Sequence, residues 1–339
     1  MPNVVLKAPK LPAPKPTRPP EPLNVSAVPS PFSTGPRTAP AGTQPFQVQW
    51  GYALIIAAIH IGSLLAFVPW LFSWTGLTLC ILGHYVFGML GITLCYHRLL
   101  THKGFRCPKW LERTLAVLGI CTLQDTPARW VAIHRRHHQH SDEHPDPHSP
   151  LVNFLWGHVG WLLIKNRELH TLDFYQHYAR DLLSDPFYFW FERKLLWLWT
   201  YVAHAALFFL AGLAIGWIST GRYLGGVQFG LSLLVWGVFV RTVLVWHVTW
   251  SVNSLTHLWG YRNYDTDDNS RNNWLVGLVA HGEGWHNNHH AQQRAAAHGH
   301  RWWELDVTWL TIRLLERLGL VTEVIRPRSE KGEPIAQLE

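Results

Sequence analysis

The chain has 339 residues, of which 48% are hydrophobic and only 15% are charged, and it contains 20 tryptophans. So low a charged fraction argues against an ordinary soluble domain of this size, and abundant tryptophan is typical of a protein with wide membrane–water interfaces. The net charge of +7 could suggest a nucleic-acid partner, but the basic residues do not form a patch of their own. They flank apolar segments, and basic residues in such positions favour contact with anionic lipid headgroups.

Residues 1–49 contain 13 prolines and few large apolar side chains. Such a segment buries too little surface to offset the entropy of ordering it, so we expect a disordered tail, with a short proline-rich docking motif as the alternative. The segment lacks the apolar core and the cleavage site of a signal peptide. We therefore predict three parts: a disordered tail over 1–49, a folded domain over 50–322 and a polar tail over 323–339.

Four apolar segments are long enough to cross about 30 Å of hydrocarbon as helices. They are 52–72, 76–96, 195–217 and 224–246. Only three residues separate the first two spans, and a short loop joins the last two, so the spans form two hairpins. The apolar runs at 111–123 and 151–164 are too short to cross a membrane and are typical of amphipathic helices at the interface or in a polar cap.

The basic residues predict the orientation of these spans. Of the 29 Lys and Arg residues, five precede the first span, 13 lie between the second and third spans, and nine follow the fourth. By the positive-inside rule, both termini and the large middle segment face the cytoplasm. The histidine motifs described next lie in these same segments, so we expect them on the cytoplasmic side as well.

Three short motifs concentrate histidine, namely "HRLLTH", "HRRHH" and "HNNHH". Their histidines are His97 and His102, then His134, His137 and His138, and finally His286, His289 and His290. On an α-helix, the H-x-x-H-H spacing places all three side chains on one face, within about 100° of arc. The two histidines of "HRLLTH" are five residues apart and can converge only if the helix ends or distorts between them.

These eight histidines predict a metal centre. They are too many for one zinc ion, which takes four ligands, and they are enough for two ions, with iron among the candidates. Soluble di-iron bundles use Glu-x-x-His repeats, which these motifs lack, so the site would be rich in histidine and poor in carboxylate. Isolated histidines are more often core, interface or surface residues. We expect core or interface positions for His60, His84, His158, His170, His177, His204 and His247, and surface positions for His298 and His300.

The segments around these motifs resemble those of the membrane fatty-acid desaturases, in particular the group of Δ9 acyl-lipid and acyl-CoA (stearoyl-CoA desaturase-like) enzymes. The resemblance covers about residues 50–322. It rests on "GITLCYHRLLTHKGF", "WVAIHRRHHQHSDEHPDPH", "GHVGWLL", "NSLTHLWGYR", "GEGWHNNHHA" and "WWELDVTWLTIRLLERLGL". The three histidine motifs alone would also fit alkane or sterol hydroxylases.

The resemblance implies an all-α integral membrane protein, in which four transmembrane helices in two hairpins carry a cytoplasmic helical cap with a histidine-rich di-iron site. It adds His257 as a ninth iron ligand and Asn253 as a residue that reaches iron through a water. These two residues are four positions apart, on one face of a helix. The residues that it implies for the wall of a bent substrate tunnel are Gln124, Trp130, Thr249 and Trp250.

The reaction that the resemblance implies removes two hydrogens at the Δ9 position of a saturated acyl chain and leaves a cis double bond. Such C–H bonds have no acidity for a general base to exploit, so two iron ions (Fe2+), dioxygen and two electrons are implied as the source of the oxidant. The chain contains no ferredoxin-like or cytochrome b5-like segment. A separate electron donor of one of these kinds would therefore be its partner, beside a lipid or acyl-CoA substrate.

Two pairs of residues bear on how the acyl chain is carried. In the acyl-CoA enzymes that the chain resembles, an Arg-Asp pair directly before the second histidine motif helps to bind coenzyme A, whereas Ala132 and Ile133 stand there in this chain. An apolar pair favours a lipid-facing entrance, and with it an acyl chain esterified in membrane lipid. The acyl-CoA enzymes have a second contact made by basic residues. Lys165 keeps one of these basic residues in this chain, whereas Asn166 replaces another.

Carboxylates behind the metal ligands would orient the imidazole rings and raise their basicity. The candidates are Asp142, Asp146, Asp267, Asp268 and Glu283, each with a solvated surface position as the alternative.

Two other functions compete with this prediction. A related membrane di-iron hydroxylase is the alternative enzyme, and a histidine-lined metal transporter is the alternative from another class. A transporter needs polar or ionisable residues along its spans. The spans of this chain offer only His60, His84, His204 and Arg241, which disfavours transport.

Overall fold

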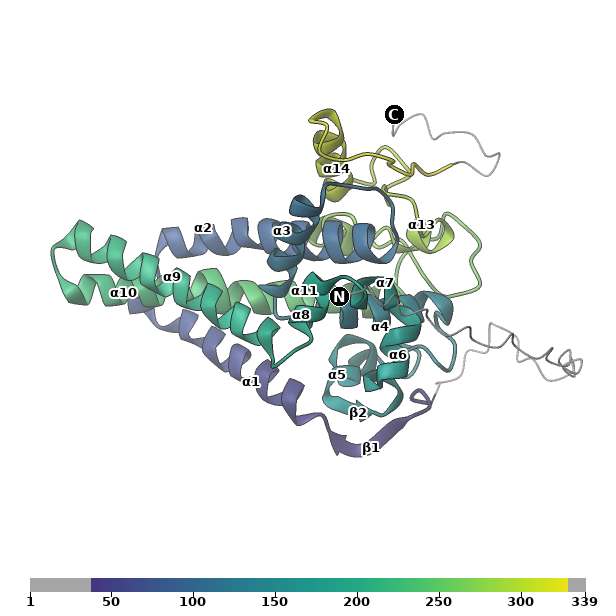
Figure 1. Ribbon diagram of the computed structural model, residues 1–339, viewed down its shortest axis with the longest axis horizontal. Helices are drawn as coiled ribbons and strands as arrows, with labels where there is room; N and C mark the ends of the chain where they lie inside the picture. Colours follow the sequence, from purple (N-terminus) through teal and green to yellow (C-terminus); the bar gives the residue numbers. More distant parts are fainter. Residues whose placement is uncertain (1–37, 329–339) are drawn as a thin grey trace, which may run out of the picture. The chain divides into compact units, whose positions relative to one another are not determined.

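The computed structural model describes residues 38–328, which belong to one compact unit that begins at Pro36. This part of the chain is largely helical (Figure 1). Four of its helical segments are long and apolar enough to cross a membrane, namely Trp50–Phe67, Trp74–Thr101, Leu196–Thr220 and Tyr223–Leu255. The four predicted spans are therefore confirmed, in the predicted order.

The spans are built from consecutive helices joined by tight turns. The first pair comprises α1 (Trp50–Leu64), η2 (Leu65–Phe67), η3 (Pro69–Leu71), α2 (Trp74–Gly83) and the π-helix η4 (His84–Thr101). The second pair comprises α9 (Leu196–Thr220), α10 (Tyr223–Leu234), η7 (Val235–Val240) and α11 (Arg241–Leu255). Glycines let α9 and α10 approach closely, since a Cβ atom on Gly212 would lie 2.8 Å from the Cα atom of Gly230.

Three spans continue past the ends that the sequence predicts, and the first ends at Phe67 instead of residue 72. The third span gains only three residues, whereas the second runs to Thr101 instead of residue 96 and the fourth to Leu255 instead of residue 246. Residues 91–101 are all buried, so packing rather than hydrophobicity keeps this less apolar end of η4 helical. The extensions carry His97 and Asn253 on helices that are continuous with the membrane spans.

We call residues 102–195 and 256–328 the cap, and they form mainly short helices and the loops that connect them. Its middle segment contains α3 (Lys109–Ile120), α4 (Pro127–Gln139), η5 (Trp156–Gly160), α5 (Trp161–Leu163), η6 (Glu168–His170), α6 (Leu172–Tyr178), α7 (Arg180–Leu183) and α8 (Pro186–Phe191). Its last segment contains α12 (Trp274–Val279), α13 (His286–Ala291) and α14 (Val307–Arg317). Helices α3, α4 and α14 pack against η4, and the buried side chains of Leu94, Leu115 and Val131 belong to the core where η4, α3 and α4 meet.

The apolar runs at 111–123 and 151–164 both form short helices, as predicted: the first largely forms α3, and the second is helical over 154–163, through η5 and α5. The second run ends in β2 (Ile164–Asn166), which pairs antiparallel with β1 (Thr43–Val48). The predicted disorder of 1–49 is therefore wrong for residues 43–48, because their backbone is paired with a strand that lies far away in the sequence. Residues 1–37 lie outside the described residues.

The folded domain also continues past its predicted end at residue 322. The amide of Ile325 donates a hydrogen bond of 2.8 Å to the carbonyl of Gly104, and its carbonyl accepts one of 2.7 Å from the amide of Ala296. The first residues of the predicted polar tail thus pack on the cap. Residues 329–339 lie outside the described residues.

Candidate metal centre

The first histidine motif lies at the end of η4, where the helix is wider than an α-helix. The amide of His102 donates a hydrogen bond of 3.1 Å to the carbonyl of His97, which is five residues earlier, as in a π-helix. Residues at this spacing share a face there, and the centroids of the two rings are 4.7 Å apart. The distortion that the spacing required is confirmed, and it brings the two histidines together.

The second motif lies on α4, which starts at a capping residue. The Thr126 hydroxyl accepts a hydrogen bond from the amide of Arg129 in the first turn. Pro127 occupies the first helical position, where the amide hydrogen that proline lacks would have no partner within the helix. Toward the other end of α4, the Nε2 atoms of His134 and His138 lie 3.1 Å apart. His137, between them in sequence, faces other histidines.

The structure sorts nine histidines into two groups, each with its possible ligand atoms within 4.8 Å of one another. The first group consists of His97, His102, His134, His138 and His289. The second group consists of His137, His257, His286 and His290. Each H-x-x-H-H motif therefore contributes to both groups. None of the seven isolated histidines belongs to either group.

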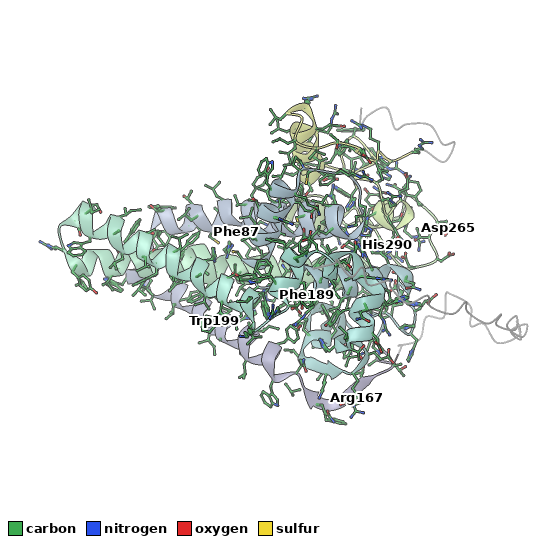
Figure 2. The ribbon with its side chains drawn as sticks, viewed as in Figure 1. Phe87, Arg167, Phe189, Trp199, Asp265 and His290 are labelled. Atoms are coloured by element: carbon green, nitrogen blue, oxygen red, sulfur yellow. The ribbon has the colours of Figure 1, made fainter. Side chains whose placement is uncertain are left out.

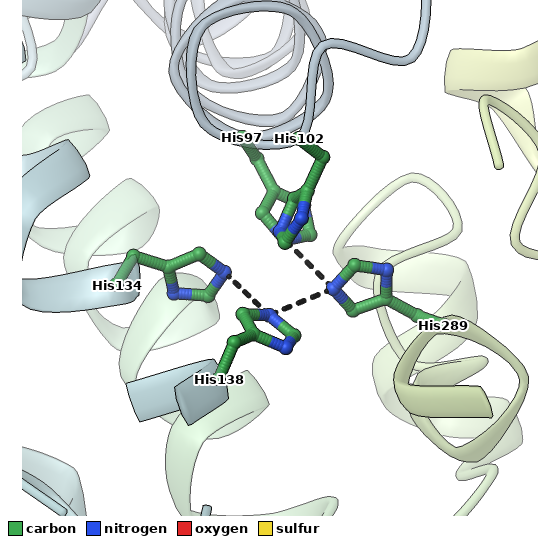
Figure 3. A group of neighbouring side chains, drawn as sticks. All are labelled: His97, His102, His134, His138 and His289. Carbon is green, nitrogen blue, oxygen red and sulfur yellow. Dashed lines mark hydrogen bonds between the residues drawn. The ribbon is translucent and has the colours of Figure 1, made fainter. Parts of the chain in front are cut away.

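The nitrogen atoms of the first group converge on one point (Figure 3). Nε2 of His289 lies 3.1 Å from Nε2 of His97 and 3.0 Å from Nε2 of His138. In the second group, Nε2 of His257 lies 3.1 Å from Nε2 of His286. Imidazole binds a first-row divalent metal at about 2.0–2.1 Å, so neighbouring ligands of one ion lie roughly 3 Å apart. Both donor sets therefore fit a bound metal ion.

Four carboxylates lie directly behind these histidines, on the side away from the convergence points. In the first group, Nδ1 of His97 is 2.5 Å from Glu283. In the second group, three histidines donate from Nδ1 to a carboxylate: His257 to Asp142 at 2.8 Å, His137 to Asp146 at 3.0 Å, and His290 to Asp268. The fifth candidate, Asp267, is exposed and forms no ion pair or hydrogen bond with a described histidine. A carboxylate on Nδ1 leaves Nε2 free to act as a ligand.

Burial and charge set the protonation of the ligands. Burial and repulsion from neighbouring imidazoles hold the pKa of His138 and His289 well below the usual range, so these rings are neutral and ready to bind a metal at pH 7. Burial also lowers the pKa of His257, but attraction and a hydrogen bond to Asp142 outweigh it and raise the pKa to about 9. A metal ion at His257 would therefore have to displace a proton.

Two histidines near the centre were missed or misplaced from the sequence. His298, which we expected at the surface, is 1% exposed, its Nδ1 lies 3.3 Å from Glu283, and its ring stacks on that of His289. His148 is 2% exposed, with its ring centroid 4.4 Å from that of His137. The surface prediction for His300 is wrong too, because the chain after α13 folds back into the cap. Three consecutive alanines just before His298, all buried, were the available signal of this close packing.

Two apolar cavities meet beside the two groups. The first cavity encloses about 760 Å³ and the second about 490 Å³. The residues that line both cavities are Trp130, His134, Thr249 and Asn253. All four residues named for the tunnel wall line the first cavity, and Gln124 donates a hydrogen bond of 3.1 Å to the Thr249 hydroxyl. Asn253 lies at the junction, one helical turn before His257.

The apolar pair before the second motif does not form an entrance. Ala132 and Ile133 are 0% and 8% exposed, because other cap helices and η4 cover α4, and Ile133 lines the first cavity. The prediction of a lipid-facing entrance at this pair is therefore wrong. Lys165 is exposed, while the Asn166 amide bonds to Ala41 and Thr43 and so helps to hold the N-terminal strand.

Comparison with known proteins supports the resemblance seen in the sequence. A family model described as fatty acid desaturase matches residues 69–315. The chain is 43% identical over 280 residues to an sn-2 palmitoyl-lipid 9-desaturase of Nostoc sp. (strain 36), covering 82% of this chain and 91% of that one. It is 43% identical over 287 residues to an sn-1 stearoyl-lipid 9-desaturase of Anabaena variabilis (85% and 97%), and 39% identical over 280 residues to an acyl-CoA C20 Delta5-desaturase of Anemone leveillei (81% and 81%). This chain therefore belongs to the fatty acid desaturase family, as the segments around its histidine motifs predicted.

Proposed function

We propose that this protein uses dioxygen to introduce a cis double bond at the Δ9 position of a saturated acyl chain in membrane lipid. The observation that carries the proposal is the junction of two apolar cavities at His134, Thr249 and Asn253, directly beside the two histidine groups. A saturated chain that passes through both cavities would present two of its methylenes to both groups at once.

The first and second groups would each hold one iron ion, with Asn253 next to the second group. When bound, the iron pair supplies the oxidising power that dioxygen and two electrons provide, which no side chain of the protein can supply. The protein contributes position: cavity walls rich in apolar and aromatic side chains exclude water, and the hydrogen bond between Gln124 and Thr249 holds the wall at the point where the cavities meet. Regioselectivity on a featureless chain then follows from where the chain stops in the cavities.

We expect the protein, purified after expression in iron-replete medium, to contain about two iron ions per chain, because each histidine group brings at least four imidazole nitrogens together and imidazole suits iron. Elemental analysis of the purified protein measures this. One zinc ion per chain and no iron would contradict the di-iron proposal.

The orientation and the electron source complete the proposal. The distribution of Lys and Arg favours a cytoplasmic cap, with both termini and the histidine groups on that side. A separate ferredoxin-like or cytochrome b5-like donor would then reach the cap from the cytoplasm.

The carrier of the acyl chain is the finer part of the proposal. Two of the three relatives described above act on lipid-bound chains, and one acts on acyl-CoA, by their names. The buried Ala132 and Ile133 provide no charged contact of the strong kind for the phosphates of coenzyme A. We therefore favour an acyl chain already esterified in a glycerolipid.

A pulse of labelled saturated fatty acid in a desaturase-deficient host that expresses the protein tests reaction and carrier together. We expect a labelled chain with one cis double bond at the Δ9 position, and we expect it in glycerolipid before it is found in acyl-CoA. A labelled alcohol in place of the alkene would instead identify a hydroxylase. Unsaturated acyl-CoA that precedes unsaturated glycerolipid would show that the carrier is coenzyme A.

A further inference from the structure

An apolar groove of about 950 Å³ lies between the first and third spans. Its walls include Ala58 and Ile59 of α1 and Val202 and Ala206 of α9. Of the residues that line it, Tyr201 alone has a polar side-chain atom, and that hydroxyl shares a hydrogen bond of 3.1 Å with Thr242. The groove therefore offers no polar group to a ligand, and its occupant must be apolar.

The groove lies at the level of the acyl chains of a bilayer, close to the headgroup layer. Trp50 begins α1 with 66% of its surface exposed, and Trp199, which is labelled in Figure 2 and lies in the first turn of α9, is 62% exposed. Exposed tryptophans at the ends of spans are typical of the membrane–water interface. Ile55 and Ile59 follow Trp50 by about 8 to 14 Å along the helix axis, at 1.5 Å per residue, which places the groove just below that interface.

Two side chains separate the groove from the candidate active site. Ile55 of α1 and Leu123 of the turn after α3 line both the groove and the first cavity, whose far wall contains Trp130 and His134. Leu123 has a φ of 58° and Asp125, in the same turn, has a φ of 72°. Left-handed backbone is unfavourable for a bulky residue such as leucine, and strained residues of this kind cluster at active sites, ligand clamps and switch regions. The barrier is thus two apolar side chains, one of them on a strained turn.

We propose that this groove is a lateral entrance, through which an acyl chain still esterified in a membrane glycerolipid passes from the bilayer, between α1 and α9, into the first cavity. Ile55 and Leu123 are the side chains that the acyl chain displaces. The glycerol and headgroup stay in the interface beside Trp50 and Trp199, so the groove needs no polar contacts. This inference rests on the proposed function and names the route by which its substrate arrives.

Two substitutions on neighbouring residues of α1 test the route. Ala57 and Ala58 are both exposed on α1, but only Ala58 lines the groove. At equal protein and iron content in membranes, we expect Ala58→Trp to slow the appearance of monounsaturated glycerolipid by about ten-fold, while Ala57→Trp changes it by less than about two-fold. An Ala58→Leu variant should give an intermediate rate.

A second experiment needs no substitution. The unmodified full chain is placed in phosphatidylcholine vesicles that contain a trace of phosphatidylcholine with a photoreactive diazirine in one saturated acyl chain. After irradiation, we expect label on residues 55–59 and 198–206. Label confined to other faces of the spans would overturn the proposal. That result is also the one expected if a second copy of the chain covered the groove.

The outcomes separate the entrance from the reaction. If the unsubstituted protein makes no unsaturated lipid, the proposed function fails. If it is active and Ala58→Trp is as active as Ala57→Trp, the entrance is wrong, and label in the groove then identifies a resident lipid that is not substrate. An Ala58→Trp protein that contains iron but is slow, together with label in the groove, supports the entrance.

Discussion

Replacing His257 with alanine is expected to reduce desaturation to below about one hundredth of the unsubstituted rate. Removing a residue that only orients a metal ligand lowers activity by up to about 100-fold, and removing the ligand itself should lower it at least as much. His257 is 1% exposed, its Nε2 lies 3.1 Å from that of His286, and its Nδ1 donates to Asp142. The substitution removes one of four nitrogen donors and leaves the buried Asp142 carboxylate without its imidazole partner. Product formation and iron content per chain are the measurements, and both should fall.

His204→Ala is the matched control, because it also removes a partly buried imidazole. His204 lies in α9 against the rings of Phe87 and Phe208, and neither of its ring nitrogens has a hydrogen-bond partner among the described residues. We expect this variant to keep most of the activity and all of the iron. If the two variants were equally active, His257 would not be a ligand.

The periodicity of the histidine motifs predicts which residues share a helix face, but not how that face is divided. On α4, His134 and His138 belong to the first group and His137 to the second. The positions of the three residues around the helix differ by less than a third of a turn. The division therefore depends on what lies opposite, which is η4 with His289 of α13 for the first group, and the other two histidines of α13 with His257, just after α11, for the second. No local pattern contains that information.

The same limit explains the other differences between the sequence and the structure. The width of η4 between His97 and His102 was required by their spacing, yet the sequence does not say whether a helix end or a π-helix would supply it. Of the neighbouring Asp267 and Asp268, only the second reaches a histidine, because the amide and hydroxyl of Ser270 hold its carboxylate in a turn. Burial of His298 follows from a chain reversal that depends on contacts with Asp306.

One buried arginine links the metal centre to the rest of the cap. Arg98 is 1% exposed and donates hydrogen bonds to Glu283 at 2.9 and 3.0 Å, to Asp306 at 2.9 Å, and to the carbonyl of Ala296 at 2.7 Å. Glu283 is the carboxylate behind His97, and Asp306 caps α14 through the amide of Trp309. The guanidinium therefore pairs with two carboxylates that are each 4% exposed.

Arg98→Met should consequently destabilise the folded protein by about 3–5 kcal/mol, because it removes one partner from a buried ionic network and leaves the others uncompensated. Arg106→Met is the control, since Arg106 pairs with Glu323 at 3.0 Å where both side chains are largely exposed, and such a pair contributes about 1 kcal/mol at most. Unfolding in detergent, followed by temperature or denaturant, measures both. If the Arg98→Met protein unfolded at the same temperature or denaturant concentration as the Arg106→Met protein, the network would not stabilise the cap. Bound iron should fall with Arg98→Met as well, because Glu283 would lose the cation that fixes it behind His97.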